Sequence, residues 1–154
     1  LVRSVKQSLC AALLCAPSLA HGQTPLGADL TATFAPVVQV ESMPDALGCI
    51  ALYRSLSLLF GPESEHFAGF QTREGFMASV AGILWADSPD GEGHTPDQVF
   101  AFLLPLINAA TDLYLAHMDA TSLATDTPFD DQILGQVDFC NAIFEALQSD
   151  DTRN

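Results

Sequence analysis

Apolar side chains recur at alternating spacings of three and four residues along much of the chain, which is the pattern of amphipathic helices. Residues 42–61 carry one such stripe, formed by Cys49, Tyr53, Leu56 and Phe60. Ser42 and Pro44 are residue types favoured in the first turn of a helix, and Gly61 followed by Pro62 is a strong stop. The pattern therefore predicts a helix over residues 42–61, with Ser42 as its cap.

Two further stretches repeat this period. Residues 62–86 carry an apolar stripe of phenylalanine, methionine, valine and leucine, interrupted by Gly69 and Gly75, so a bend is expected near Gln71. Residues 127–148 carry a second stripe that includes Cys140, after a start at Thr127. Each stretch is expected to be one helix of the same domain.

The stretch 95–119 is apolar on nearly all sides. Thr95 and Gln98 stand at the spacing of a capping box, and Pro105 is expected to kink or split the helix. Because few polar side chains interrupt it, this stretch is predicted to be the most buried helix.

Four helices with short polar connections predict an all-α fold, an antiparallel up-down-up-down bundle of four helices. Residues 42–150 would form this single domain. Residues 21–41 would be an extended or mobile N-terminal arm, because Pro36 interrupts a segment with several β-branched residues. Residues 151–154 would be a disordered acidic tail.

The first twenty residues have the pattern of a secretory signal peptide. Arg3 and Lys6 precede a short apolar run, and small residues stand near its end. Cleavage is expected between Ala20 and His21, with a site after Gly22 as the alternative. The protein is therefore predicted to be periplasmic or secreted.

Cleavage would leave Cys49 and Cys140 as the cysteines of the exported chain. Two cysteines in an oxidising compartment are expected to form a disulfide. In the predicted bundle the first and last helices are neighbours. Both cysteines lie on apolar stripes at heights that agree to within about one helical turn, so a bond between these helices is predicted.

The chain is strongly acidic, with a net formal charge of −14. Loss of Arg3 and Lys6 leaves three arginines against nineteen acidic residues, a formal charge of −16. Such a surface repels nucleic acid and anionic lipid headgroups. After the signal region no stretch is expected to be long and charge-free enough to span a bilayer, so no stable membrane insertion is predicted.

Residues with candidate chemistry are few. His66, His94 and His117 are weak candidates for metal ligands, since none stands at the spacing of a helical metal site. No phosphate-binding loop, nucleophile motif or haem-attachment motif occurs in the sequence, so no cofactor is expected.

Arg54 lies between apolar positions of the first predicted helix, where basic residues are scarce. It is expected to pair with a carboxylate such as Asp138 or Asp112. If it faced a cavity instead, its guanidinium could hold a carboxylate or phosphate ligand.

Two functions remain open from the sequence. The first is an exported, non-enzymatic helical protein that acts through protein contacts or by binding a small apolar ligand. The alternative is a small metal-handling or hydrolytic enzyme that uses histidines and carboxylates. An apolar pocket would favour the first, and convergence of two histidines would favour the second.

Overall fold

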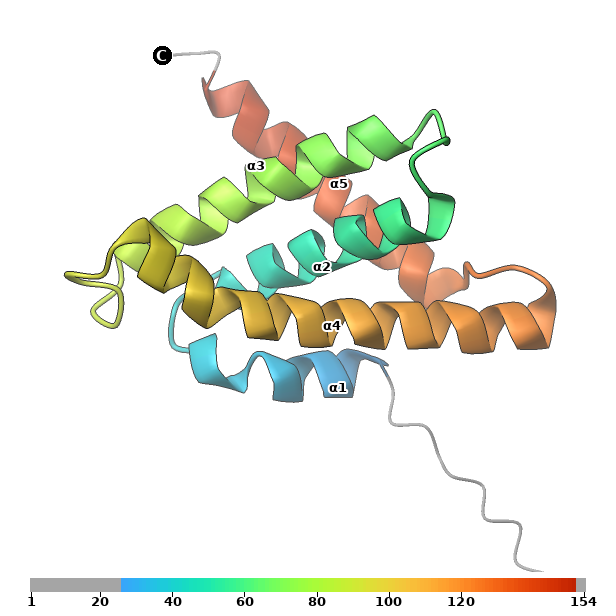
Figure 1. Ribbon diagram of the computed structural model, residues 1–154, viewed down its shortest axis with the longest axis horizontal. Coiled ribbons are helices and arrows are strands. Elements are labelled where there is room, and N and C mark those ends of the chain that lie inside the picture. The colour runs from blue at the N-terminus through green and yellow to red at the C-terminus, as the bar shows by residue number, and fades with distance from the viewer. Residues whose placement is uncertain (1–25, 152–154) are drawn as a thin grey trace, which may run out of the picture.

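The computed structural model describes residues 26–151, which are helical throughout apart from their connections (Figure 1). In chain order the helices are α1 (Leu26–Thr33), the short 3-10 helix η1 (Ala35–Val37), α2 (Met43–Phe60), α3 (Phe67–Ala86), α4 (Pro96–Thr125) and α5 (Asp131–Asp151). The predicted all-α class is confirmed, but the described chain has five α-helices rather than four. The predicted signal peptide, its cleavage site at Ala20 and His21, and residues 152–154 lie outside the described residues.

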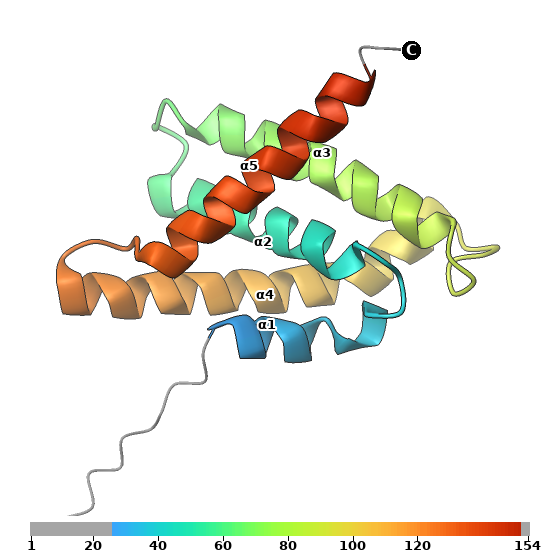
Figure 2. The same ribbon diagram turned by 180° about the vertical axis from the view of Figure 1, so that it is seen from behind.

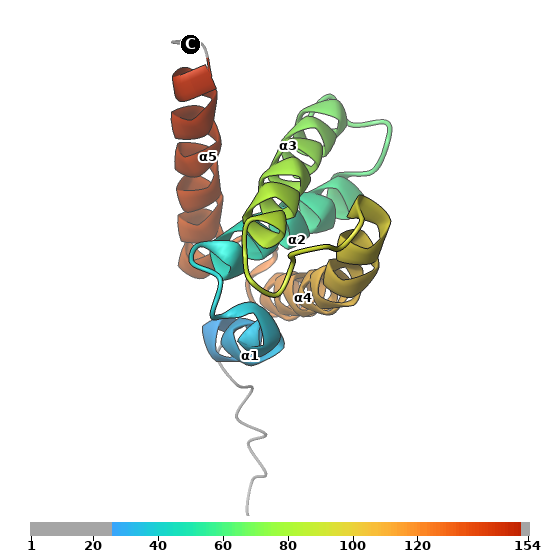
Figure 3. The same cartoon turned by 90° about the vertical axis from the view of Figure 1, so that its left-hand side faces the viewer.

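Helix α2 is the centre of the fold. Eight consecutive residues, Ala46 to Tyr53, are buried, and eight residues make more than two turns, so every side of this part of α2 is covered. Figure 3 shows α3, α4 and α5 arranged around α2, and each of them contacts it. The prediction that the 95–119 stretch is the most buried helix was therefore wrong. Small residues in α2, such as Ala46, Gly48 and Ala51, let its neighbours approach closely.

Helix α4 buries one face and exposes another. Its buried face carries Val99, Leu103, Ile107, Ala110, Thr111, Tyr114 and Met118. Phe100 and Phe102 are exposed by 48% and 42%. Pro105 lies inside a continuous helix, and the first turns of α4 run at an angle to the rest, as a proline kink would produce (Figure 1).

Among residues 26–151, α4 is the helix that is long and apolar enough to cross a membrane when judged by length and composition, although no such stretch was predicted after the signal region. About a third of its most apolar window is buried within the protein. Core helices of soluble proteins share this length and composition, so the property alone does not place α4 in a bilayer.

The expected irregular arm at residues 21–41 contains helical structure where it is described. α1 and η1 lie there, with α1 against α4 (Figure 2). Thr31 and Thr33 each donate a side-chain hydrogen bond to the carbonyl four residues earlier, which satisfies hydroxyls that would otherwise favour non-helical structure. Burial of Phe34 and Val37 then fixes the segment to the core.

Helix α5 crosses α2 and α3 obliquely, in front of them in Figure 2, rather than running beside them along its length. The up-down-up-down bundle is therefore not confirmed. The predicted disulfide is present: Cys49 of α2 and Cys140 of α5 are bonded, with Cα atoms 5.4 Å apart. The bond suggests an oxidising compartment.

Helix ends follow the predicted chemistry in part. The capping box is present, since the Thr95 hydroxyl accepts from the Gln98 N–H and the Gln98 side chain accepts from the Thr95 N–H. Ser42 forms no side-chain cap; it takes a left-handed conformation, with φ of 63°. α3 begins at Phe67, not Pro62, and α5 begins after Asp130. Thr127 instead forms a turn, accepting a hydrogen bond from the Phe129 N–H.

Candidate functional site

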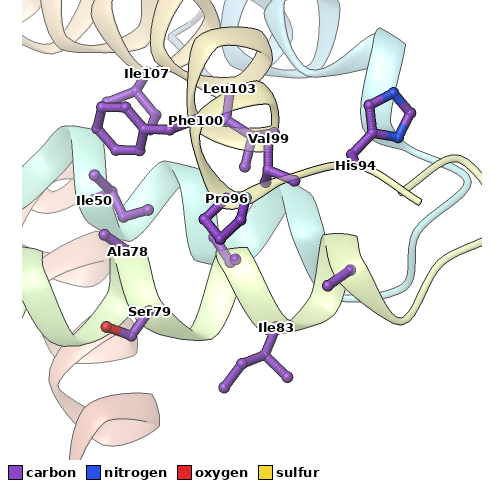
Figure 4. A pocket seen from close by; sticks show the side chains of 13 residues that line it. Ile50, Ala78, Ser79, Ile83, His94, Pro96, Val99, Phe100, Leu103 and Ile107 are labelled. Carbon is purple, nitrogen blue, oxygen red and sulfur yellow. The ribbon is translucent and has the colours of Figure 1, made fainter. Parts of the chain in front are cut away.

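An apolar groove lies between α3 and α4, with Ile50 of α2 at its base (Figure 4). We call it the α3–α4 groove. Its volume is about 350 Å³. The residues that line it are Ile50, Ala78, Ser79, Ala81, Gly82, Ile83, Ala86, His94, Pro96, Val99, Phe100, Leu103 and Ile107.

The groove exists because α3 and α4 present side chains of unequal size to each other. α3 contributes mainly small residues, among them Ala78 and Gly82, whereas α4 contributes Val99, Phe100 and Leu103. A methyl group added at Gly82 would meet no atom within 4 Å, so this position faces open space. Both helices pack mainly on α2 and less on each other, which leaves the space between them unfilled.

One end of the α3–α4 groove continues into a smaller hollow lined by Arg54 and Glu74. The Nε and Nη2 atoms of Arg54 each lie 2.8 Å from Oε1 of Glu74, and its Nη1 donates to Oδ1 of Asn108 at 2.9 Å. Arg54 therefore pairs with a carboxylate, as expected, but this carboxylate is Glu74 and not Asp138 or Asp112. With all three guanidinium nitrogens engaged, Arg54 closes the end of the groove as part of a neutral ion pair.

The polar side chains that line the α3–α4 groove do not form a catalytic pair. Ser79 donates its hydroxyl hydrogen to the Gly75 carbonyl at 3.1 Å. Figure 4 shows Ser79 and His94 at opposite sides of the groove, with Val99 and Pro96 between them. The groove can therefore hold an apolar molecule, but the groups on its wall are not arranged to activate one.

The three histidines have separate surroundings. His66 is exposed, lies 3.6 Å from a carboxylate oxygen of Glu65 and forms a T-shaped ring contact with Phe60. His94 is exposed in the connection before α4. Among residues 26–151, no group of three or more His, Cys, Asp or Glu side chains could hold a metal ion.

His117 belongs to a structural pair. Its Nε2 lies 2.7 Å from Oδ2 of Asp130, whose Oδ1 accepts from the Ile133 N–H at 2.9 Å and so caps α5. Partial burial raises the pKa of Asp130. The hydrogen bonds from Ile133 and His117, together with the His117 charge, outweigh that effect, and the net pKa lies below its usual value.

The residues that line the α3–α4 groove were not predicted as a set from the sequence. Ala78, Gly82 and Ala86 stand four residues apart and so share one face of α3, a signal that was present in the sequence. What the sequence could not supply was the identity of the opposing helix, because a stripe of small residues fits equally well against any neighbour.

Comparison of the chain with protein-family models, with curated proteins and with solved structures gave no match.

Proposed function

We propose that this protein is an exported, non-enzymatic helical protein that binds a small apolar ligand in the α3–α4 groove. The observation that carries the proposal is the groove itself. Its volume of about 350 Å³ falls in the range of ligand sites, and its wall is largely aliphatic and aromatic.

The chemistry of the wall limits the ligand. Arg54 and Glu74, which line the adjoining hollow, form an ion pair, and the residues that line the groove itself include no Asp, Glu, Lys or Arg. The whole chain is strongly acidic, which disfavours anionic ligands at long range. The groove is thus suited to a neutral molecule held by burial of apolar surface.

Export is the second part of the proposal. It rests on the signal-like pattern of residues 1–20 and agrees with the Cys49–Cys140 disulfide, which is typical of oxidising compartments. The periplasm or the extracellular space is the proposed location, with no nucleic-acid partner and no stable insertion in a membrane.

A neutral environment-sensitive dye such as Nile red tests the ligand site. Gly82→Phe places a ring in the open space of the groove. It should lower dye affinity at least tenfold, since the ring occupies the volume that the dye needs. Gly135→Phe is the matched control, because Gly135 is also helical, also has no atom within 4 Å of an added Cβ, and lines no described pocket.

Equal dye affinity in Gly82→Phe and the wild-type protein would reject the groove as the binding site. Fluorescence of Trp85, the single tryptophan of the chain, reports whether each variant is folded. We do not propose the metal-handling or hydrolytic alternative, because no three metal ligands come together among the described residues and Ser79 and His94 lie on opposite sides of the groove.

A further inference from the structure

A second pocket, separate from the α3–α4 groove, lies beneath α1. We call it the α1 pocket; its volume is about 260 Å³. Its wall comes from α1, α2, α4, α5 and the segment that joins α1 to α2. The lining residues are Gly27, Leu30, Thr31, Phe34, Val38, Pro44, Asp45, Gly48, Tyr114 and Gln136.

Tyr114 contributes a polar atom to this wall that has no partner. The whole residue is buried, with 0% of its surface exposed, and its hydroxyl forms no hydrogen bond within the protein. A buried hydroxyl without a partner is unfavourable, and most such groups in folded proteins are satisfied by some molecule. Burial also raises the pKa of Tyr114, so the hydroxyl keeps its proton and can donate it.

Tyr114 and Gln136 approach one point of the pocket wall. A Cβ atom built on Gly48 would lie 3.9 Å from the Tyr114 hydroxyl oxygen and 3.9 Å from Nε2 of Gln136. The Gln136 amide nitrogen donates to the Cys140 sulfur at 3.6 Å, a weak acceptor. The Tyr114 hydroxyl and the Gln136 amide are therefore two donors without a strong hydrogen-bond acceptor, and they lie beside Gly48, which leaves room for another atom.

The charge of the residues that line the α1 pocket limits which hydrogen-bond acceptor a ligand can carry. Asp45, which is exposed, is the charged residue that lines this pocket. A carboxylate ligand would be repelled by it, whereas a neutral carbonyl oxygen would not. Leu30, Phe34 and Val38 offer apolar surface for the rest of the molecule.

We propose that the α1 pocket binds a small neutral carbonyl compound, such as an amide or ketone, whose oxygen accepts hydrogen bonds from Tyr114 and Gln136. Gln136 is partly buried and the Tyr114 hydroxyl is fully buried, so binding in this way requires the Gln136 side chain to rotate as the ligand enters. The site is independent of the α3–α4 groove, since the two share no lining residue.

The test uses benzamide as the probe in ligand-observed NMR, with benzoate and toluene as matched compounds of similar shape. Benzamide should bind more tightly than either, because benzoate is repelled by Asp45 and toluene accepts no hydrogen bond. Tyr114→Phe and Gly48→Ala should each weaken benzamide binding at least tenfold. Ala fits at Gly48 because its Cβ meets only ordinary contacts, the nearest at 3.8 Å, so this variant folds.

Gly82→Phe is the control here, since it alters only the α3–α4 groove and should leave benzamide affinity unchanged. Thermal unfolding without probe gives a second readout: Tyr114→Phe should not lower the midpoint, because the hydroxyl has no partner to lose. No benzamide binding by the wild-type protein would overturn the proposal. A lower midpoint in Tyr114→Phe with unchanged benzamide affinity would do the same, by assigning the hydroxyl to a structural water.

Discussion

At the scale of single residues, Gly91 shows how tightly the α3–α4 connection folds back on α3. A Cβ atom at Gly91 would collide with the Trp85 carbonyl oxygen. Ser88 holds this arrangement by donating to the Trp85 carbonyl at 2.6 Å and accepting from the Gly91 N–H at 3.1 Å. The two backbones meet so closely that only glycine fits.

Gly91→Ala should therefore lower the free energy of unfolding by about 1–3 kcal/mol, the usual range for overpacking a filled site. Urea denaturation monitored by Trp85 fluorescence measures it, and Trp85 lies beside the change. Gly135→Ala is the control: its added methyl meets no atom, and it should be neutral or stabilising by up to about 1 kcal/mol. Equal stability of Gly91→Ala and the wild-type protein would show that the connection can shift.

At the scale of elements, the α4–α5 connection depends on one carboxylate. Asp130 joins the two helices, because one of its oxygens contacts His117 of α4 while the other accepts from the Ile133 N–H in the first turn of α5. Asparagine at this position keeps the cap and removes the charge, so it separates the two roles.

Asp130→Asn should be less stable than the wild-type protein near neutral pH. Because folding lowers the Asp130 pKa, its ionised form stabilises the fold above the unfolded-state value of about 3.9, and this contribution is lost as pH falls through the lower folded value. Urea midpoints measured from pH 7 to pH 2 should thus converge at the acid end. A stability difference between the two proteins that persists undiminished to pH 2 would contradict this assignment. His117→Gln removes one partner of the Asp130 carboxylate, so it should reduce the pH-dependent stabilisation.

Helical periodicity located the four long helices but not α1. The eight residues of α1 include a glycine and two threonines, which have weak helix propensity, so the local pattern does not predict a helix. Tertiary burial of Leu26 and the following Phe34 supplies what the local sequence lacks. The start of α5 was also misplaced, because Thr127 and Asp130 are both favourable N-cap residues and the sequence alone does not distinguish them; the structure has Asp130 as the cap.

At the scale of the whole molecule, the positions of Cys49 and Cys140 predicted that α2 and α5 meet but not the angle at which these helices cross. Cys49 and Cys140 both lie on apolar faces, and that information is in the sequence. The crossing angle depends on how side-chain ridges fit together, which one residue pair does not fix. The central position of α2 depends in the same way on its small residues, and the sequence does not show which helices pack against them.

Removing the disulfide with Cys49→Ala and Cys140→Ala together should lower the free energy of unfolding by about 4 kcal/mol. The bond closes a loop across a sequence separation of 91, and a loop of that length restricts the unfolded chain strongly. Urea denaturation with and without reductant measures the effect. Reductant should destabilise the wild-type protein and leave the double variant unchanged. If the double variant lost less than about 1 kcal/mol of its free energy of unfolding, packing alone would be sufficient to hold α5 in place.

The Cys49–Cys140 bond also determines what a protease could release. The connections between α2 and α3, α3 and α4, and α4 and α5 all lie between these two cysteines in the sequence. A single cut in any of them leaves two fragments joined covalently, and both halves of the core stay attached. A cut before Met43 is different: it frees α1, the cover of the α1 pocket, and leaves the α3–α4 groove on a chain that is still closed.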